Sequence, residues 1–194
     1  MKKSNTQVNT FSMVLCALFS ALIVVGAFIK IPTPMVPITL QAEFVILAGL
    51  MLGSKLGAAS AGIYLTVGLL GLPVFTQGGG IGYVFQPTFG YVIGFVFGAY
   101  LAGLVVEKAK KSTYAVYFLA CLAGLGAIYA TGLIYVYLIK RFYLNVEIGL
   151  WVLLLNYFLL TLPGDIILCA GGALLVKRLK PITAKYFALK KVVD

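Results

Sequence analysis

Long apolar runs, separated by short polar or glycine- and proline-rich segments, dominate the 194-residue sequence. Most runs approach the roughly 20 residues that a helix needs to cross about 30 Å of hydrocarbon. The two-residue alternation of a membrane β-barrel is absent. The pattern therefore predicts an all-α polytopic membrane protein, with apolar segments at about 11–29, 38–53, 56–71, 90–106, 113–139 and a final one that ends near residue 176.

The final apolar segment is too long for one straight span. Residues 148–176 would extend about 44 Å at 1.5 Å per residue, beyond the hydrocarbon thickness. The sequence LPGD at 162–165 supplies a break, because Pro163 lacks an N–H and suits the first turn of a helix. We therefore expect a helix over 148–160 that lies or dips at the outer surface, followed by a sixth transmembrane helix from Pro163.

Composition supports a membrane protein with one compact domain over residues 1–194. The chain is 62% hydrophobic and 10% charged, with a mean hydropathy of +1.06, which is too apolar for a soluble domain. No stretch between the spans is long enough for a soluble domain. The expected tails are residues 1–10 and 180–194.

The net charge of +10 could indicate a nucleic-acid partner, but the positions of the basic residues favour topology as its cause. With both termini in the cytoplasm, three basic residues lie outside and twelve inside, which is the positive-inside distribution of a plasma-membrane protein. We expect no nucleic-acid partner. The outside residues are Lys30, Lys140 and Arg141, and the inside ones are Lys2, Lys3, Lys55, Lys108, Lys110, Lys111, Lys177, Arg178, Lys180, Lys185, Lys190 and Lys191.

Catalysis has few residues to use in this sequence. Histidine is absent, only five residues are acidic, and the three cysteines, Cys16, Cys121 and Cys169, fall inside apolar spans, where a lone cysteine is usually a small buried hydrophobe. The phosphate-binding pattern GxxxxGK[ST] does not occur. We therefore expect no enzyme activity, no metal site, no cofactor and no nucleotide hydrolysis by this chain.

Asp165 is the acidic residue most indicative of function, because it is the one strongly charged side chain between Ile148 and Val176. Intramembrane acids are energetically costly and often functional. In the first turn of the sixth helix its carboxylate could cap free backbone N–H groups. Alternatively, it could point into an outward-facing cavity and accept hydrogen bonds from a ligand. Both roles remain open from the sequence.

A second candidate for a binding-site wall is the uncharged loop GLPVFTQGGGIGYVFQPTFGY at 71–91. Its glycines allow close approach of the backbone, its glutamines offer donors and acceptors, and its aromatic residues offer apolar faces. A flexible connecting loop is the alternative. The candidate ligand-binding residues here are Gln77, Gly78, Gly79, Gly80, Tyr83, Gln86 and Tyr91.

The first external loop, residues 30–44, contains three prolines that favour extended backbone. Pro32, Pro34 and Pro37 could make it a stiff flap over a site. Gln41 and Glu43 follow at the start of the second span. We include Gln41 among the candidate ligand-binding residues, whereas Glu43 could equally be an exposed interfacial acid or a partner of Lys30.

Small residues recur at every fourth position in two segments, which places them on one helix face and allows close helix contact. We favour packing inside the protein over a partner interface. The residues are Gly49, Gly53 and Gly57, then Gly90, Gly94 and Gly98.

Four motifs in order along almost the whole chain resemble the biotin-specific substrate-binding (S) components of energy-coupling-factor (ECF) transporters, the BioY family. They are IPTPMVPITLQ at 31–41, GLPVF with GGGIGY within 71–83, QPTFGYVIGF at 86–95, and LPGD at 162–165. The resemblance implies six transmembrane helices and a biotin site near the extracellular side. It also implies a transmembrane coupling protein and two ATP-binding subunits as partners, which would hydrolyse ATP in place of this chain.

The resemblance also implies individual roles. An AxxxA motif on the first helix would meet the coupling protein, and here it is formed by Ala17 and Ala21. The Asp165 carboxylate and the loop amides would bind the ureido ring of biotin, and aromatic side chains its apolar parts. The family often has lysine where this chain has Leu168, and glycine at the positions of Gln86 and Phe89.

Other functions remain open at this stage. The chain could be an S component for another vitamin or a solute channel. An intramembrane enzyme fits the composition least, because catalytic residue types are scarce. For a biotin carboxylate, the basic candidates on the outside are Lys30, Lys140 and Arg141.

Overall fold

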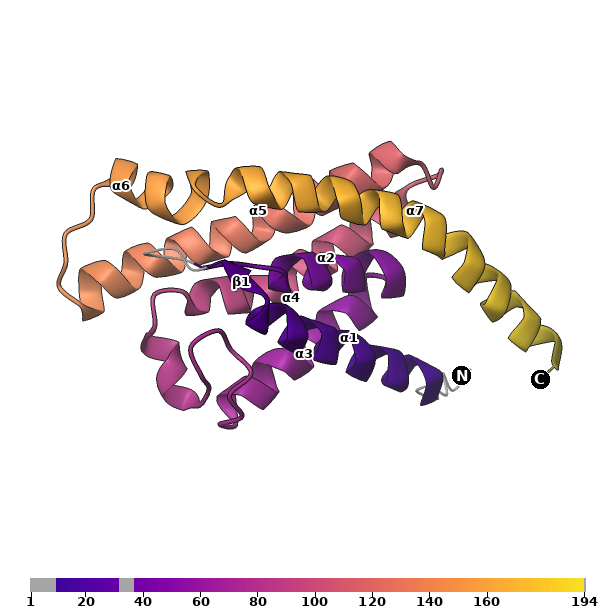
Figure 1. The fold of residues 1–194 in the computed structure, drawn as a ribbon, viewed down its shortest axis with the longest axis horizontal. Coiled ribbons are helices and arrows are strands. Elements are labelled where there is room, and N and C mark those ends of the chain that lie inside the picture. The colour runs from indigo at the N-terminus through magenta and orange to yellow at the C-terminus, as the bar shows by residue number, and fades with distance from the viewer. Residues whose placement is uncertain (1–9, 32–36, 194) are drawn as a thin grey trace, which may run out of the picture.

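The computed structural model describes residues 10–31 and 37–193, with side chains as far as Pro181. Helices pack side by side along most of the length of the molecule (Figure 1). They are α1 (Thr10–Phe28), α2 (Gln41–Leu52), α3 (Ser54–Leu69), α4 (Phe89–Lys108), α5 (Tyr114–Leu138), α6 (Leu150–Leu154) and α7 (Leu162–Val193).

Shorter elements gather at the end of the molecule opposite the two chain ends, called the loop end below (Figure 1). The strands β1 (Lys30–Ile31) and β2 (Ile38–Thr39) pair antiparallel, with Lys30 opposite Thr39. One 3₁₀ helix, η1, covers Ile81–Phe85. Two π-helical turns, η2 (Ile139–Tyr143) and η3 (Leu155–Leu159), extend α5 and α6.

The helices coincide with the apolar segments predicted from the sequence. Within the described residues four helical stretches are long and apolar enough to cross a membrane: Thr10–Phe28, Phe89–Lys108, Tyr114–Tyr143 and Leu150–Pro181. The helices α2 and α3, of 12 and 16 residues, are shorter than the roughly 20 residues of a full span. The all-α membrane fold is confirmed, whereas the number of crossings and the side on which the termini lie stay predictions.

The glycines spaced four apart contact neighbouring helices inside the bundle, which confirms that they serve internal packing. A Cβ atom at Gly98 would lie 2.9 Å from the carbonyl oxygen of Gly124 on α5, and one at Gly57 would lie 2.6 Å from the Cα of Gly49. Gly94 likewise faces the backbone of Ile128. Glycine at these positions lets α4 pack on α5, and α2 on α3, at backbone distance.

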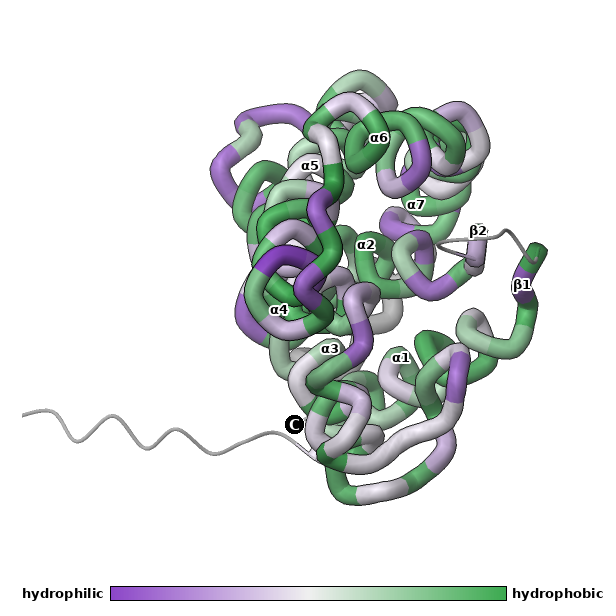
Figure 2. Tube along the Cα trace, turned by 90° about the vertical axis from the view of Figure 1, so that its left-hand side faces the viewer, coloured by the Kyte–Doolittle hydropathy of each residue, from purple (hydrophilic) through white to green (hydrophobic). Residues whose placement is uncertain are grey.

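Most of the helical residues are hydrophobic, whereas hydrophilic residues concentrate in the connections between helices (Figure 2). The buried core draws on every helix from α1 to α7 and includes Ile23, Val45, Leu50, Tyr64, Phe95, Tyr117, Cys121, Ile128, Leu153 and Cys169. The three cysteines are buried and free, as predicted. Many side chains on the outward faces of the helices are apolar and exposed, which is expected where lipid surrounds them.

The LPGD sequence breaks the last apolar segment as predicted, because α7 begins at Leu162, directly after turn residues 160 and 161. The preceding helix differs from the expectation. Figure 1 shows α6 continuing the line of α7, and Leu150–Pro181 forms one long apolar helical stretch, so the chain does not turn aside between the two helices. Pro163 in the first helical turn has no N–H to satisfy, which allows a break without a change of direction. Far from the break, α7 runs to Val193 and includes the residues expected to form a tail.

Candidate functional site

A cavity with about 620 Å³ of space between atoms, part of it open to solvent, lies among α2, α4, α5, α7 and the loop-end segments. Apolar walls come from α4 and α5, and hydroxyl groups surround them. Its polar lining residues are Thr39, Gln41, Thr76, Tyr83, Thr88, Tyr91, Tyr129, Thr161 and Asp165.

Asp165 lines this cavity from the first turn of α7. The Tyr129 hydroxyl of α5 donates a hydrogen bond to its Oδ2 atom over 2.5 Å. Thr161 completes the group, because its Oγ1 atom lies 2.5 Å from the same hydroxyl. Among the described residues the Asp165 carboxylate makes no hydrogen bond to a backbone N–H and no ion pair. The geometry thus favours the cavity-facing role over the capping role.

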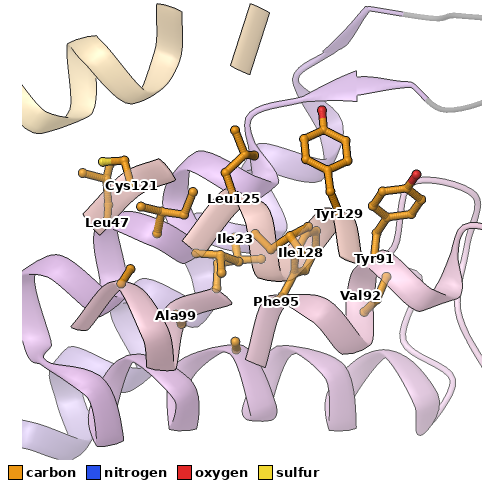
Figure 3. Close-up of a cluster of buried hydrophobic side chains, with 14 of the residues drawn as sticks. Ile23, Leu47, Tyr91, Val92, Phe95, Ala99, Cys121, Leu125, Ile128 and Tyr129 are labelled. Atoms are coloured by element: carbon orange, nitrogen blue, oxygen red, sulfur yellow. The ribbon is translucent and has the colours of Figure 1, made fainter. Parts of the chain in front are cut away.

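Tyrosine rings hold the neighbouring wall in place. Tyr91 donates from its hydroxyl to the backbone oxygen of Tyr157 over 2.6 Å, and its ring meets that of Tyr129 edge-on at 6.1 Å between centroids. Figure 3 shows both hydroxyls pointing away from the apolar cluster that contains Phe95 and Ile128. This cluster and the hydroxyl groups therefore form an apolar surface with a polar edge, as small-ligand sites commonly do.

Gln41 reaches the cavity but is also part of a buried network. Its amide Nε2 donates to the Tyr64 hydroxyl, and its Oε1 accepts from Thr39 Oγ1 over 3.2 Å. Tyr64 in turn donates to the Val74 carbonyl over 3.2 Å. With only 4% of its surface exposed, Gln41 connects the start of α2 to α3 and the glycine-rich loop.

The glycine-rich loop contributes fewer wall residues than the sequence suggested. Tyr83 lines the cavity, with its hydroxyl 3.1 Å from Thr76 Oγ1. The other five candidates from the sequence lie outside the lining, and Gln77 and Gln86 are exposed. Their role in ligand binding stays a prediction; they are Gln77, Gly78, Gly79, Gly80 and Gln86.

Three of the loop glycines have structural roles. Gly78 and Gly80 adopt φ values of 118° and 98°, which other residues rarely adopt. The Gly80 N–H donates to the Gly68 carbonyl over 2.7 Å, and a Cβ at Gly79 would collide with the Leu72 carbonyl. The glycine run therefore folds the loop back on the end of α3.

Glu43 lies behind Asp165, in a packed region that also contains Leu168 and Cys169. Its Oε1 atom is buried and has no hydrogen-bond partner among the described residues. The alternatives considered from the sequence, an exposed acid or a partner of Lys30, are both wrong, because the packing of α2 on Gly172 of α7 turns this side chain inward.

Sequence reasoning missed Tyr129 and Thr161. Several tyrosines occur in α5, and the sequence alone does not show which of them contacts Asp165. The fold brings Tyr129 to Asp165, although the two residues are 36 positions apart in the chain. A buried tyrosine usually finds a partner for its hydroxyl, which was the available signal. For the flap, Pro37 lines the cavity, whereas Pro32 and Pro34 lie outside the described residues.

The proposed partner-binding alanines lie on the outward face of α1. Ala17 and Ala21 are exposed, and the opposite face buries Cys16, Ser20 and Ile23. This placement leaves room for another helix beside them; it does not identify what covers them.

The arrangement can bind a neutral ring that carries N–H donors. The Asp165 carboxylate would accept from these donors, and the apolar wall would contact the ring. Within residues 10–31 and 37–181, no group of three or more His, Cys, Asp or Glu side chains could hold a metal ion.

Solved structures include one that closely matches this fold. It is the crystal structure of the S-component for biotin from an ECF-type ABC transporter, with a TM-score of 0.76 and 28% sequence identity. The match covers 93% of this chain and 95% of the other. The chain therefore has the S-component fold.

Curated relatives agree with this match. A probable biotin transporter BioY of Lysinibacillus sphaericus is 44% identical over 96% of this chain and 95% of the relative. The biotin transporter BioY of Thermotoga maritima is 46% identical over 62% of this chain and 70% of the relative. The model of the BioY family matches residues 1–185, and the chain belongs to the BioY family.

Proposed function

We infer that this chain is a multi-pass protein of the plasma membrane that binds biotin and takes it up as the S component of an ECF-type transporter. Its family, its S-component fold and its relatives named as biotin transporters support this function. The observation that carries it within the molecule is the cavity, where the single carboxylate of Asp165 stands beside an apolar wall.

Biotin has chemical groups that suit this cavity. Its ureido ring carries two N–H donors and a carbonyl acceptor, and its thiophane ring is apolar. Because Tyr129 occupies Oδ2 of Asp165, Oδ1 is available to accept a ureido N–H. The hydroxyl oxygens of Tyr91 and Thr161 lie on the same lining and can accept a hydrogen bond from the second ureido N–H. Phe95 and Ile128 can pack on the apolar ring.

Energy for uptake would come from partners. We propose a transmembrane coupling protein and two ATP-binding subunits, because the sequence contains no phosphate-binding loop of its own. The exposed alanines of α1 support a close contact with a helix of the coupling protein, since small residues four apart let two backbones approach. The chain itself would need no cofactor.

Equilibrium binding to the purified chain in detergent or nanodiscs tests the function. Biotin should bind saturably and tightly, with dethiobiotin as a competitor and riboflavin, thiamine and folate without effect. Saturable binding of another vitamin in place of biotin would assign the chain a different substrate. Flux of many solutes through liposomes without saturable binding would indicate a channel.

A further inference from the structure

Lys30 does not itself line the cavity, but it bonds to a residue of the cavity wall. It lies in β1, opposite Thr39 of β2, and its side chain is exposed. Its Nζ atom donates to the carbonyl oxygen of Thr76 over 2.9 Å. Both Thr39 and Thr76 line the cavity. The hairpin and the glycine-rich loop are thus joined by this ammonium group where they border the same space.

The two other basic residues expected on the outside contact tyrosines away from the cavity. Lys140 lies over the ring of Tyr157, 5.6 Å from its centroid. Arg141 donates to the Tyr137 hydroxyl over 2.8 Å and lies over the same ring. Neither tyrosine lines the cavity. Of these three cations, Lys30 is the one bonded directly to a residue of the cavity wall.

An ammonium group has three N–H donors and no acceptor. The bond to Thr76 uses one of them, and it also restricts where the long side chain places its charge. Two donors remain for a carboxylate, with which an ammonium forms hydrogen bonds stronger than those between neutral groups. A neutral acceptor at the same position would gain much less.

We propose that Lys30 binds the carboxylate of the ligand and so makes the site selective for the acid over its neutral derivatives. This inference rests on the proposed function and extends it, because it assigns the charged end of biotin to the loop end of the cavity. Lys30 is then a specificity-determining residue, and its bond to Thr76 keeps the charge in position before the ligand arrives.

The test compares biotin with biotin methyl ester, which has the same rings and no charge, on the purified wild-type chain and on Lys30→Gln. For biotin, the dissociation constant should rise by roughly threefold to fivefold in Lys30→Gln, as expected for an ion pair at an exposed position. For the ester it should stay within about twofold, which also shows that the variant is folded. Lys30→Arg should retain most of the preference for the acid, and Arg141→Gln serves as the matched control with wild-type behaviour.

The outcomes separate the two proposals. If wild-type protein binds neither compound, the proposed function itself is wrong. If biotin binds but Lys30→Gln changes the affinities for acid and ester equally, or changes neither, the carboxylate assignment is wrong. A loss of acid preference in Arg141→Gln instead would place the carboxylate at Arg141.

Discussion

The hydroxyl of Tyr129 lies 2.5 Å from Oδ2 of Asp165, so that side chains from α5 and α7 form one hydrogen-bonded unit in the cavity wall. Thr161 joins the same unit through the Tyr129 hydroxyl. One carboxylate oxygen is therefore held by the protein, and the proposed function assigns the other to the ligand.

Asp165→Asn should weaken biotin binding by about 1.5 to 3 kcal/mol, the range for hydrogen bonds to a charged group. The substitution preserves shape but removes the negative charge that would accept the ureido N–H. Isothermal titration calorimetry on the purified variant measures the change. Unchanged affinity in a folded variant would remove Asp165 from the binding site.

Tyr129→Phe should weaken biotin binding by about 0.5 to 1.5 kcal/mol, because the carboxylate loses the neutral donor that orients it. Tyr135→Phe is the matched control: Tyr135 lies on the same helix and donates to the Val84 carbonyl over 2.5 Å, but it does not line the cavity. A double-mutant cycle with Asp165→Asn should show strong non-additivity. Additive effects would mean that Tyr129 acts independently of Asp165.

Ala17→Phe and Ala21→Phe should abolish biotin uptake in cells that contain the full transporter while leaving biotin binding to the isolated chain intact. A large ring would keep the partner helix from approaching the backbone of α1. Leu119→Phe, at an exposed position of α5, is the control and should support normal uptake. Loss of biotin binding in the alanine variants would instead assign these residues to internal packing.

Gly98→Ala should lower the free energy of unfolding by about 1 to 3 kcal/mol, the usual cost of overpacking. Its new Cβ would lie 2.6 Å from Ile128 Cγ1 and 2.9 Å from the Gly124 carbonyl oxygen. Gly126→Ala is the control, because a Cβ there meets nothing within 4 Å and alanine favours helix. Thermal unfolding in detergent should separate the two variants, and equal melting temperatures would contradict the close α4–α5 contact.

Much of the fold could be predicted from the sequence because the signals are local. Apolar runs marked the helices, Pro163 marked the break before α7, and the spacing of Gly94 and Gly98 marked a packed face. Asp165 was identifiable in the same way, since one charge in a long apolar stretch stands out. Each of these inferences needed only a few neighbouring residues.

The rest of the site depends on contacts between distant segments. The sequence makes the loop glycines candidates for ligand binding, which stays a prediction, but it does not show that Gly79 packs against the Leu72 carbonyl or that Gly80 bonds to Gly68. Which side of a loop faces a cavity is decided by such packing, and composition does not reveal it. The inward position of Glu43, against Gly172 of α7, follows from the helix packing in the same way.

The placement of Asp165 and Lys30 gives the cavity an electrical direction. Carboxyl groups of Glu43 and Asp165 share one small space between α2 and α7, whereas the ammonium of Lys30 borders the loop segments. An anionic group of a ligand about 4 Å from the Asp165 carboxylate would be repelled by on the order of 4 kcal/mol at an effective dielectric constant of 20. Under the proposed assignment of the ligand carboxylate to Lys30, charge alone orients a ligand with one anionic end, and the reversed pose, with its carboxylate beside Asp165, is disfavoured without any steric barrier.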